Sequence, residues 1–178
     1  MLYTRKGDRG TSGLFGSKKR LQKDNLVYDA LGTLDELTSF LGVCRAYALR
    51  SKADNLSIAG IVLDTQHCVS IIEAELAGAS KKMTKKHIEK IERTIDKLEK
   101  IVGNPHAFTI PGATVLSASF DYARSVARRA ERCVVHVGET HPVSSETLAY
   151  LNRLSSLLYV LARFAAYHAG VKELSPTY

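Results

Sequence analysis

Three arginines recur at every fourth residue in one stretch of the chain: Arg124, Arg128 and Arg132. On a helix this spacing puts the three guanidinium groups on one side, where each neighbouring pair repels by about 0.2–0.5 kcal/mol. Guanidinium groups bind phosphate oxygens in pairs and stay charged at any working pH. The spacing alone therefore supports two hypotheses equally, a polyphosphate site and a structural ion-pair network with Asp35 and Glu131.

Residues 1–23 form a second candidate site for phosphate. They contain four glycines, interleaved with threonine, serine, lysine and arginine, and show no apolar periodicity. The backbone N–H groups and ammonium groups of such a flexible segment are suited to binding a phosphate chain. Neither the P-loop spacing nor G-x-G-x-x-G is present. Taken alone, the segment is at least as well explained as a disordered basic tail.

The overall charge points to an anionic partner. The formal net charge is +7 at pH 7, which favours nucleic acid, a nucleotide or an anionic protein. No apolar run approaches the roughly 18 residues that a membrane span needs. The three cysteines, Cys44, Cys68 and Cys133, include no C-x-x-C pair and fit a reducing compartment. We therefore expect a cytoplasmic protein that does not enter a membrane.

The chain offers few residues for metal or acid–base chemistry. It has no Glu-x-x-His motif, and none of its six histidines lies four residues from another, so we expect no metal site built from side chains. No residues have the spacing of a Ser-His-Asp or Cys-His catalytic group. An enzyme with this sequence would work by positioning its substrates and stabilising charge.

Five amphipathic patterns predict the helices that would position these residues. They run from about Asp24 to Cys44, from Asn55 or Ser57 to Gly78, from Thr84 to Gly103, from Thr114 or Ser117 to Val137, and from Ser144 or Ser145 to Gly170. No strand of useful length is expected. Five helices with mostly short links predict an all-α, five-helix up-and-down bundle in one domain, residues 1–178. Small residues on the first and fourth helices indicate a further packing surface and hence a homo-oligomer.

Separated motifs along the chain resemble those of one enzyme family. They are YTRKGDRGTS at residues 3–12, KD at 23–24, GTLDEL at 32–37, FTIPG at 108–112, RSVARRAER at 124–132 and YLNRLS at 150–155. In this order they resemble the PduO-type corrinoid adenosyltransferases, which transfer the 5′-deoxyadenosyl group of ATP to cob(I)alamin. The resemblance implies a bundle of the ferritin-like, adenosyltransferase type that assembles as a homotrimer with active sites between subunits.

The resemblance also implies roles for individual residues. The residues that it assigns to ATP binding are Thr4, Arg5, Lys6, Gly7, Ser12, Gly13, Lys23, Arg128, Arg129, Glu131, Arg132 and Asn152. Arg128 and Arg132 are in addition catalytic, and Asp35 and Arg124 form an ion pair between subunits. Mg²⁺ would bridge the phosphates with few protein ligands. Cobalamin is implied as a substrate, and a reductase that supplies its cob(I) state is implied as a partner.

Phe108 receives different roles from its residue type and from the resemblance. A phenylalanine in a loop is more often a core anchor, whereas the resemblance places Phe108 against the lower face of the corrin, where it favours four-coordinate cobalt. Ala113 departs from the family, which more often has a second glycine after Pro111-Gly112.

Two other functions are compatible with the basic residues alone. One is a helical module that binds nucleic acid or polyphosphate without chemistry. The other is a structural trimer whose arginines form interface ion pairs. The family resemblance favours an adenosyltransferase over both alternatives, and it implies that the protein has no nucleic-acid partner.

Overall fold

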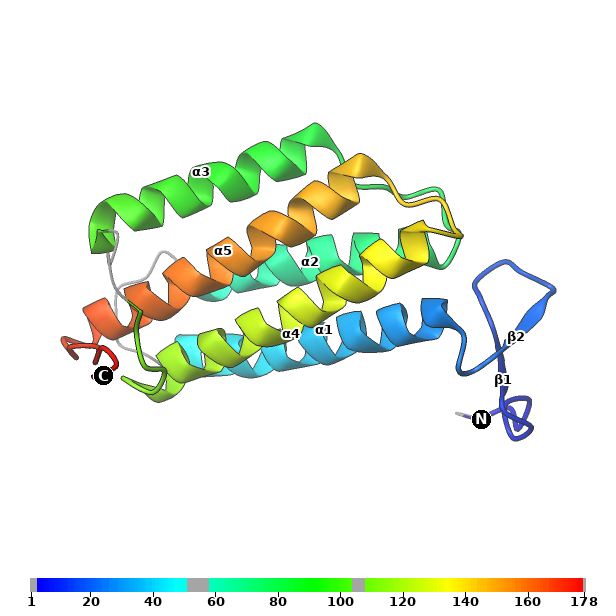
Figure 1. The fold of residues 1–178 in the computed structure, drawn as a ribbon, viewed down its shortest axis with the longest axis horizontal. Coiled ribbons are helices and arrows are strands. Elements are labelled where there is room, and N and C mark those ends of the chain that lie inside the picture. The colour runs from blue at the N-terminus through cyan, green and yellow to red at the C-terminus, as the bar shows by residue number, and fades with distance from the viewer. Residues whose placement is uncertain (1–2, 51–57, 104–107, 178) are drawn as a thin grey trace.

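The computed structural model describes residues 3–50, 58–103 and 108–177, in which five helices form an up-and-down bundle (Figure 1). The helices are α1 (Leu26–Arg50), α2 (Ile58–Leu76), α3 (Lys85–Val102), α4 (Val115–Gly138) and α5 (Ser145–His168). Two three-residue strands, β1 (Thr11–Gly13) and β2 (Arg20–Gln22), precede them. The predicted all-α, five-helix fold is confirmed. Within the described residues, no helix combines the length and the apolar character needed to cross a membrane.

Helix α4 packs against both α1 and α5. Of the other two helices, α3 packs against α5 and α2 packs against α1. The face of α4 toward its neighbours carries small side chains, because Ala123, Ala127 and Ala130 are fully buried. Small residues allow a close approach of α1 and α5. The arginines of α4 are consequently left on the sides of the helix that these neighbours do not cover.

Local hydrogen bonds fix where the later helices begin. The Thr114 side chain accepts a hydrogen bond from the backbone N–H of Ser117 at 3.0 Å, and this caps α4. At α3 the backbone N–H of Thr84 donates to Nδ1 of His87 at 3.0 Å, so a histidine does what glutamate does in a common capping box. The predicted starts of α3 and α4 are therefore confirmed.

A buried glutamate ties α2 to the start of α5. Glu75 accepts hydrogen bonds from the backbone N–H of Ser144 at 2.8 Å and from the hydroxyl of Thr147 at 2.6 Å. The Ser144 hydroxyl also donates to Glu75 at 3.1 Å. A buried carboxylate needs such donors to offset its lost hydration. Glu75 thus sets the position of the first turn of α5.

Two boundaries differ from the sequence prediction or cannot be compared with it. The apolar stripe of α1 closes at Cys44, but the helix continues to Arg50, because the intervening residues are mostly good helix formers and Ala48 still packs on the core. The predicted start of α2 at Asn55 or Ser57 lies outside the described residues.

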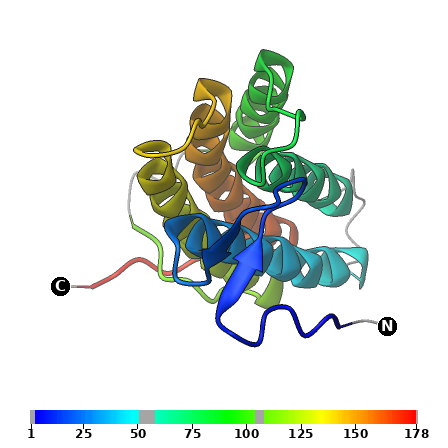
Figure 2. The same cartoon turned by 90° about the vertical axis from the view of Figure 1, so that its right-hand side faces the viewer.

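The N-terminal segment forms a small hairpin, although no strand of useful length was expected there. β1 pairs antiparallel with β2, with Ser12 opposite Leu21. The Arg20 guanidinium holds the hairpin together, because it donates to the Thr11 hydroxyl at 2.9 Å and to the carbonyl of Lys6 at 2.8 Å. Figure 2 shows the hairpin at the end of the bundle where α1 begins.

Candidate active site

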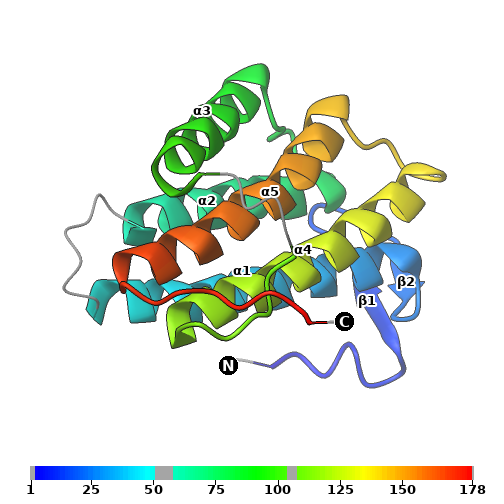
Figure 3. The same ribbon diagram turned by 60° about the vertical axis from the view of Figure 1, so that its left-hand side comes forward.

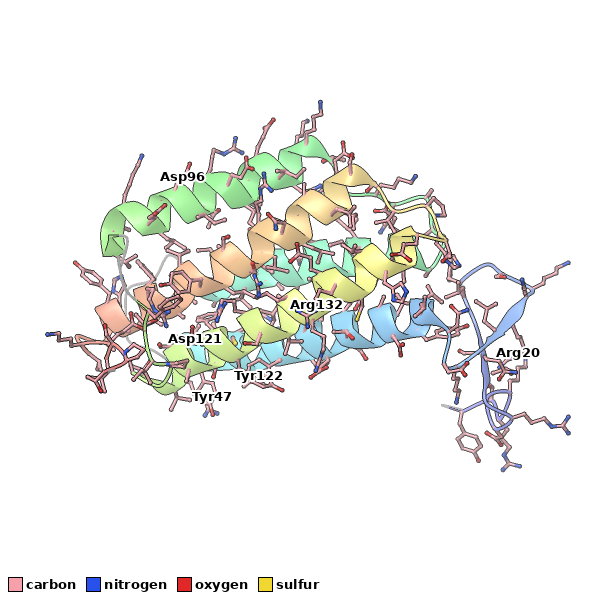
Figure 4. The ribbon with its side chains drawn as sticks, in the orientation of Figure 1. Arg20, Tyr47, Asp96, Asp121, Tyr122 and Arg132 are labelled. Atoms are coloured by element: carbon pink, nitrogen blue, oxygen red, sulfur yellow. The ribbon has the colours of Figure 1, made fainter. Side chains whose placement is uncertain are left out.

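The arginine cluster lies on the exposed side of α4 and consists of Arg128, Arg129 and Arg132. All three side chains are exposed. Nη1 of Arg132 donates to the backbone carbonyl of Arg128 at 3.2 Å, which joins two of these arginines across one helical turn. Figure 4 shows Arg132 on the middle part of α4, between Asp121 toward one end of the bundle and the hairpin with Arg20 at the other.

Carboxylates neutralise only part of this cluster. Arg129 forms an ion pair with Glu36 of α1, and both partners are close to half exposed, so the pair contributes little to stability. In the part of the chain that the structure describes, no carboxylate forms an ion pair with Arg128 or Arg132. None of the three arginines whose spacing suggested an ion-pair network, Arg124, Arg128 and Arg132, forms an ion pair within the described chain. Arg128 and Arg132 are therefore available to an anion.

Asn152 of α5 lies beside the cluster. Its amide nitrogen donates to Oε1 of Glu131 at 3.1 Å, and its amide oxygen accepts from Arg153 at 3.1 Å. Arg153 in turn donates through Nε to Glu92 of α3 at 3.2 Å. This chain of polar contacts connects α4, α5 and α3 and fixes the orientation of the Asn152 amide next to the exposed arginines.

The N-terminal residues singled out from the sequence lie in and beside the hairpin. Ser12 and Gly13 are on β1, Thr4, Arg5, Lys6 and Gly7 precede it, and Lys23 follows β2. The backbone N–H of Lys23 donates to the carbonyl of Gly10 at 2.9 Å. A Cβ atom on Gly7 would lie 3.3 Å from Nζ of Lys23, so the ammonium group lies directly over the glycine. None of the interactions found among the described residues joins this hairpin to the arginine cluster.

Phe108 lies at the opposite end of α4 from the hairpin. Its side chain is 82% exposed, so the interpretation of Phe108 as a core anchor is wrong. Ile110, Pro111 and Gly112 beside it are also exposed, so this loop lies on the surface of the bundle rather than in its core. Arg128 lies roughly 20 Å farther along, counted from Val115 at 1.5 Å per residue. One chain therefore does not bring Phe108, the arginine cluster and the hairpin into a single compact site.

Asp35 and Arg124 do not form an ion pair within the described part of this chain. Asp35 is exposed on α1, and Arg124 is half-buried on α4. Nε of Arg124 is shielded from solvent, and no hydrogen-bond partner for it occurs among the described residues. Asp121, which precedes Arg124 by three residues, instead forms a buried ion pair with Arg163 of α5.

Three interactions of this region were missed from the sequence: Glu36 with Arg129, the hairpin contacts of Arg20, and the buried pair of Arg163 and Asp121. Only Arg163 carries a usable signal, because it is the one charged residue in the apolar run at 157–166. Such a residue in a core helix is normally paired.

Among the described residues, no group of three or more His, Cys, Asp or Glu side chains could hold a metal ion.

Comparisons with known proteins show the family to which the chain belongs. Residues 2–165 match the family described as cobalamin adenosyltransferase. The corrinoid adenosyltransferase of Citrobacter freundii is 37% identical over 169 residues, which cover 91% of this chain and 93% of the relative. Human corrinoid adenosyltransferase MMAB is 34% identical, over 97% of this chain and 71% of its own length.

Solved structures give the same result. A variant PduO-type ATP:corrinoid adenosyltransferase from Lactobacillus reuteri, complexed with cobalamin and ATP, superposes with a TM-score of 0.91 at 26% identity, over 99% of both chains. A second variant of that enzyme, complexed with ATP, superposes with a TM-score of 0.87. The chain therefore belongs to the cobalamin adenosyltransferase family and is a corrinoid adenosyltransferase.

Proposed function

We propose that this enzyme binds ATP through Arg128 and Arg132 of α4 and through the N-terminal hairpin, and transfers the 5′-deoxyadenosyl group to the cobalt of cob(I)alamin. The observation that supports this most is the pair of exposed arginines on α4, Arg128 and Arg132, which no carboxylate of the described chain neutralises. Guanidinium groups in that state are matched to the oxygens of a triphosphate.

The reaction needs charge stabilisation more than proton transfer. An electron pair on cobalt attacks C5′ of ATP, the Co–C bond forms, the C5′–O bond breaks, and its electron pair leaves with triphosphate. The nucleophile is cob(I)alamin itself, so no general base is required. Arg128 and Arg132 stabilise the charge that builds on the departing triphosphate, and the fixed position of ATP aligns C5′ with the cobalt.

The remaining residues of the ATP site have supporting roles. Thr4, Arg5, Lys6, Gly7, Ser12, Gly13 and Lys23 enclose the phosphates with backbone N–H groups and cationic side chains. Glu131 and Asn152 are already hydrogen-bonded to each other, which supports a role in orienting the nucleotide. Mg²⁺ would be held largely by phosphate oxygens and water, as is usual for Mg²⁺ in nucleotide sites.

Phe108 acts at the corrin. Its exposed ring is available to lie against the lower face of the macrocycle, where it would exclude the lower axial ligand from cobalt. Four-coordinate cobalt is easier to reduce to the +1 state, so Phe108 would assist the reduction that precedes adenosyl transfer. A separate reductase would supply the electron.

The complete site would form between subunits of a homotrimer. Three features support this. No hydrogen bond or ion pair found among the described residues joins the hairpin to the arginine cluster, and the buried Nε of Arg124 has no hydrogen-bond partner there. Val43, Tyr47 and Tyr122 also leave apolar surface exposed on α1 and α4. Asp35 of a neighbouring subunit would supply the missing partner of Arg124.

Residues 1–178 would function as one domain, with residues 1–23 as its nucleotide-binding segment. A cytoplasmic location is supported by the free thiols of Cys44, Cys68 and Cys133.

The fate of the phosphates tests the proposed reaction. The protein is incubated with ATP, Mg²⁺ and chemically reduced cob(I)alamin, and the phosphate products are separated by anion-exchange chromatography. One triphosphate per adenosylcobalamin is expected. Release of ADP or pyrophosphate with an unmodified corrinoid would contradict the proposal, and salt-sensitive binding of polyphosphate without any turnover would point to a non-catalytic binding module.

A further inference from the structure

Arg163 of α5 is a buried charged residue that contacts three separate segments of the chain. Its side chain is 4% exposed, and its partner Asp121 on α4 is 5% exposed. Nη2 of Arg163 lies 2.6 Å from Oδ2 of Asp121, and Nη1 donates to the hydroxyl of Thr109 at 2.8 Å. Nε lies 2.6 Å from Oε1 of Glu173, as an ion pair whose angles are not those of a hydrogen bond.

Two of these partners belong to segments at the same end of the bundle. Thr109 is part of the Phe108 loop, residues 108–114, and Glu173 is part of the C-terminal segment, residues 169–177. A second contact joins the two segments directly, because the backbone N–H of Ile110 donates to the carbonyl of Leu174 at 2.7 Å. Figure 3 shows the C-terminal segment (red) passing the loop (green) that leads into α4.

The chemistry of this cluster suits positioning better than stabilisation. Burying an arginine with one carboxylate, and partly burying a second, is costly, and well-packed apolar residues often stabilise a core as well or better. Burial, together with the nearby charge of Asp121, raises the pKa of Glu173 despite the attraction of Arg163. The planar guanidinium, however, directs its donors toward three segments at once, and the ring of Tyr159 lies 4.8 Å from its central carbon.

We propose that Arg163 is a positioning residue that anchors the Phe108 loop to α4 and to the C-terminal segment, so that the Phe108 ring is held where the corrin binds. Thr109 transmits the restraint to its neighbour Phe108, and Glu173 holds the C-terminal segment against the loop. This inference rests on the proposed role of Phe108. It adds that the loop is positioned from inside the bundle, through a residue that contacts neither substrate.

The test uses the two peripheral partners, because removing Arg163 itself would leave Asp121 as an unpaired buried charge. Thr109→Val removes the hydroxyl that accepts from Arg163, and Glu173→Gln removes the ion pair. Both leave the pair of Arg163 and Asp121 intact. Matched controls are Thr94→Val on α3, where the hydroxyl donates to the carbonyl of Lys90, and Glu139→Gln beyond α4.

The expected effect is specific to the corrinoid. Loss of one buried contact should lower the fraction of four-coordinate cob(II)alamin formed with saturating MgATP, seen by electron paramagnetic resonance, by about 2- to 10-fold. The KM for the corrinoid should rise with it, whereas the Kd for ATP stays at the wild-type value in both variants and both controls. A loss of ATP affinity in parallel with a fall in Tm would overturn the inference, because it would show a structural role only.

A double-mutant comparison provides the second criterion. If the anchor acts through the ring of Phe108, then Glu173→Gln should have no further effect on the four-coordinate fraction in a Phe108→Ala background. Equal effects in both backgrounds would overturn the inference. If the unmodified enzyme forms adenosylcobalamin but Thr109→Val and Glu173→Gln both behave like it, the proposed role of Arg163 is overturned and the proposed function stands. If the unmodified enzyme forms no adenosylcobalamin, the proposed function is overturned, and with it the role of Arg163.

Discussion

Replacement of Phe108 by alanine should leave the fold intact and affect one step of the reaction. Full burial of a phenylalanine side chain contributes about 1.5–3 kcal/mol. Because Phe108 is 82% exposed, only about a fifth of that contribution, roughly 0.3–0.6 kcal/mol, is at stake. For a chain of this size, such a loss lowers Tm by at most about 2 °C.

Two other phenylalanines provide matched controls. Phe15 in the hairpin is 79% exposed, and Phe120 on α4 is fully buried. Phe15→Ala should match Phe108→Ala in Tm, because the two rings are exposed to a similar extent. Phe120→Ala should cost about 3–5 kcal/mol, which lowers Tm by at least about 6 °C.

The functional effect of Phe108→Ala is measured in two assays. Formation of four-coordinate cob(II)alamin, followed by electron paramagnetic resonance, should fall at least about tenfold, equivalent to roughly 1.4 kcal/mol. The reaction of preformed cob(I)alamin with ATP should change much less, because it no longer depends on loss of the lower ligand. Equal losses in both assays, or a Tm as low as that of Phe120→Ala, would refute the reasoning.

Three further predictions follow from the site and the core. Arg128→Lys keeps the charge but loses bidentate geometry, so kcat/KM should fall at least about tenfold with an unchanged circular dichroism spectrum; unchanged kinetics would remove Arg128 from the site. Limited trypsin digestion near Arg9 and Lys18 should slow when MgATP is added, and equal rates would exclude residues 1–23 from the ATP site. Burial raises the pKa of the Cys44 thiol from 9.0 to about 12, so Cys44 should resist thiol reagents at neutral pH until the protein unfolds. Its contribution to stability is full below pH 9 and is lost as pH rises toward 12, and rapid labelling of the native protein at Cys44 would contradict its burial.

The helices could be predicted from the sequence because their apolar residues recur with helical spacing. Ile91 and Leu98, for example, lie on one face of α3 and are buried as the spacing requires. Capping residues such as Thr114 then locate the helix ends, because they act over three or four residues. Both signals are local, which is why they survive without knowledge of the tertiary structure.

Other features depend on contacts between distant residues. The hairpin was missed because its strands have three residues each, too few for an alternating pattern. In addition, the hydrogen bond from Arg20 to Thr11 that stabilises it joins residues nine positions apart in the sequence. The exposure of Phe108 could not be read from its residue type, because it depends on the path of the loop around Thr109 and Arg163. The pairing of Asp121 with Arg163 was missed for the same reason, because the two residues lie 42 positions apart in the sequence.

The central claim is that this enzyme forms a bond between cobalt and C5′ of ATP. Chemically reduced cob(I)alamin is mixed with the wild-type enzyme and MgATP under anaerobic conditions, and the absorption spectrum is recorded over time. We predict replacement of the cob(I)alamin spectrum by that of adenosylcobalamin, with a much slower change for Arg128→Lys. Persistence of cob(I)alamin in the presence of enzyme and MgATP would contradict the account.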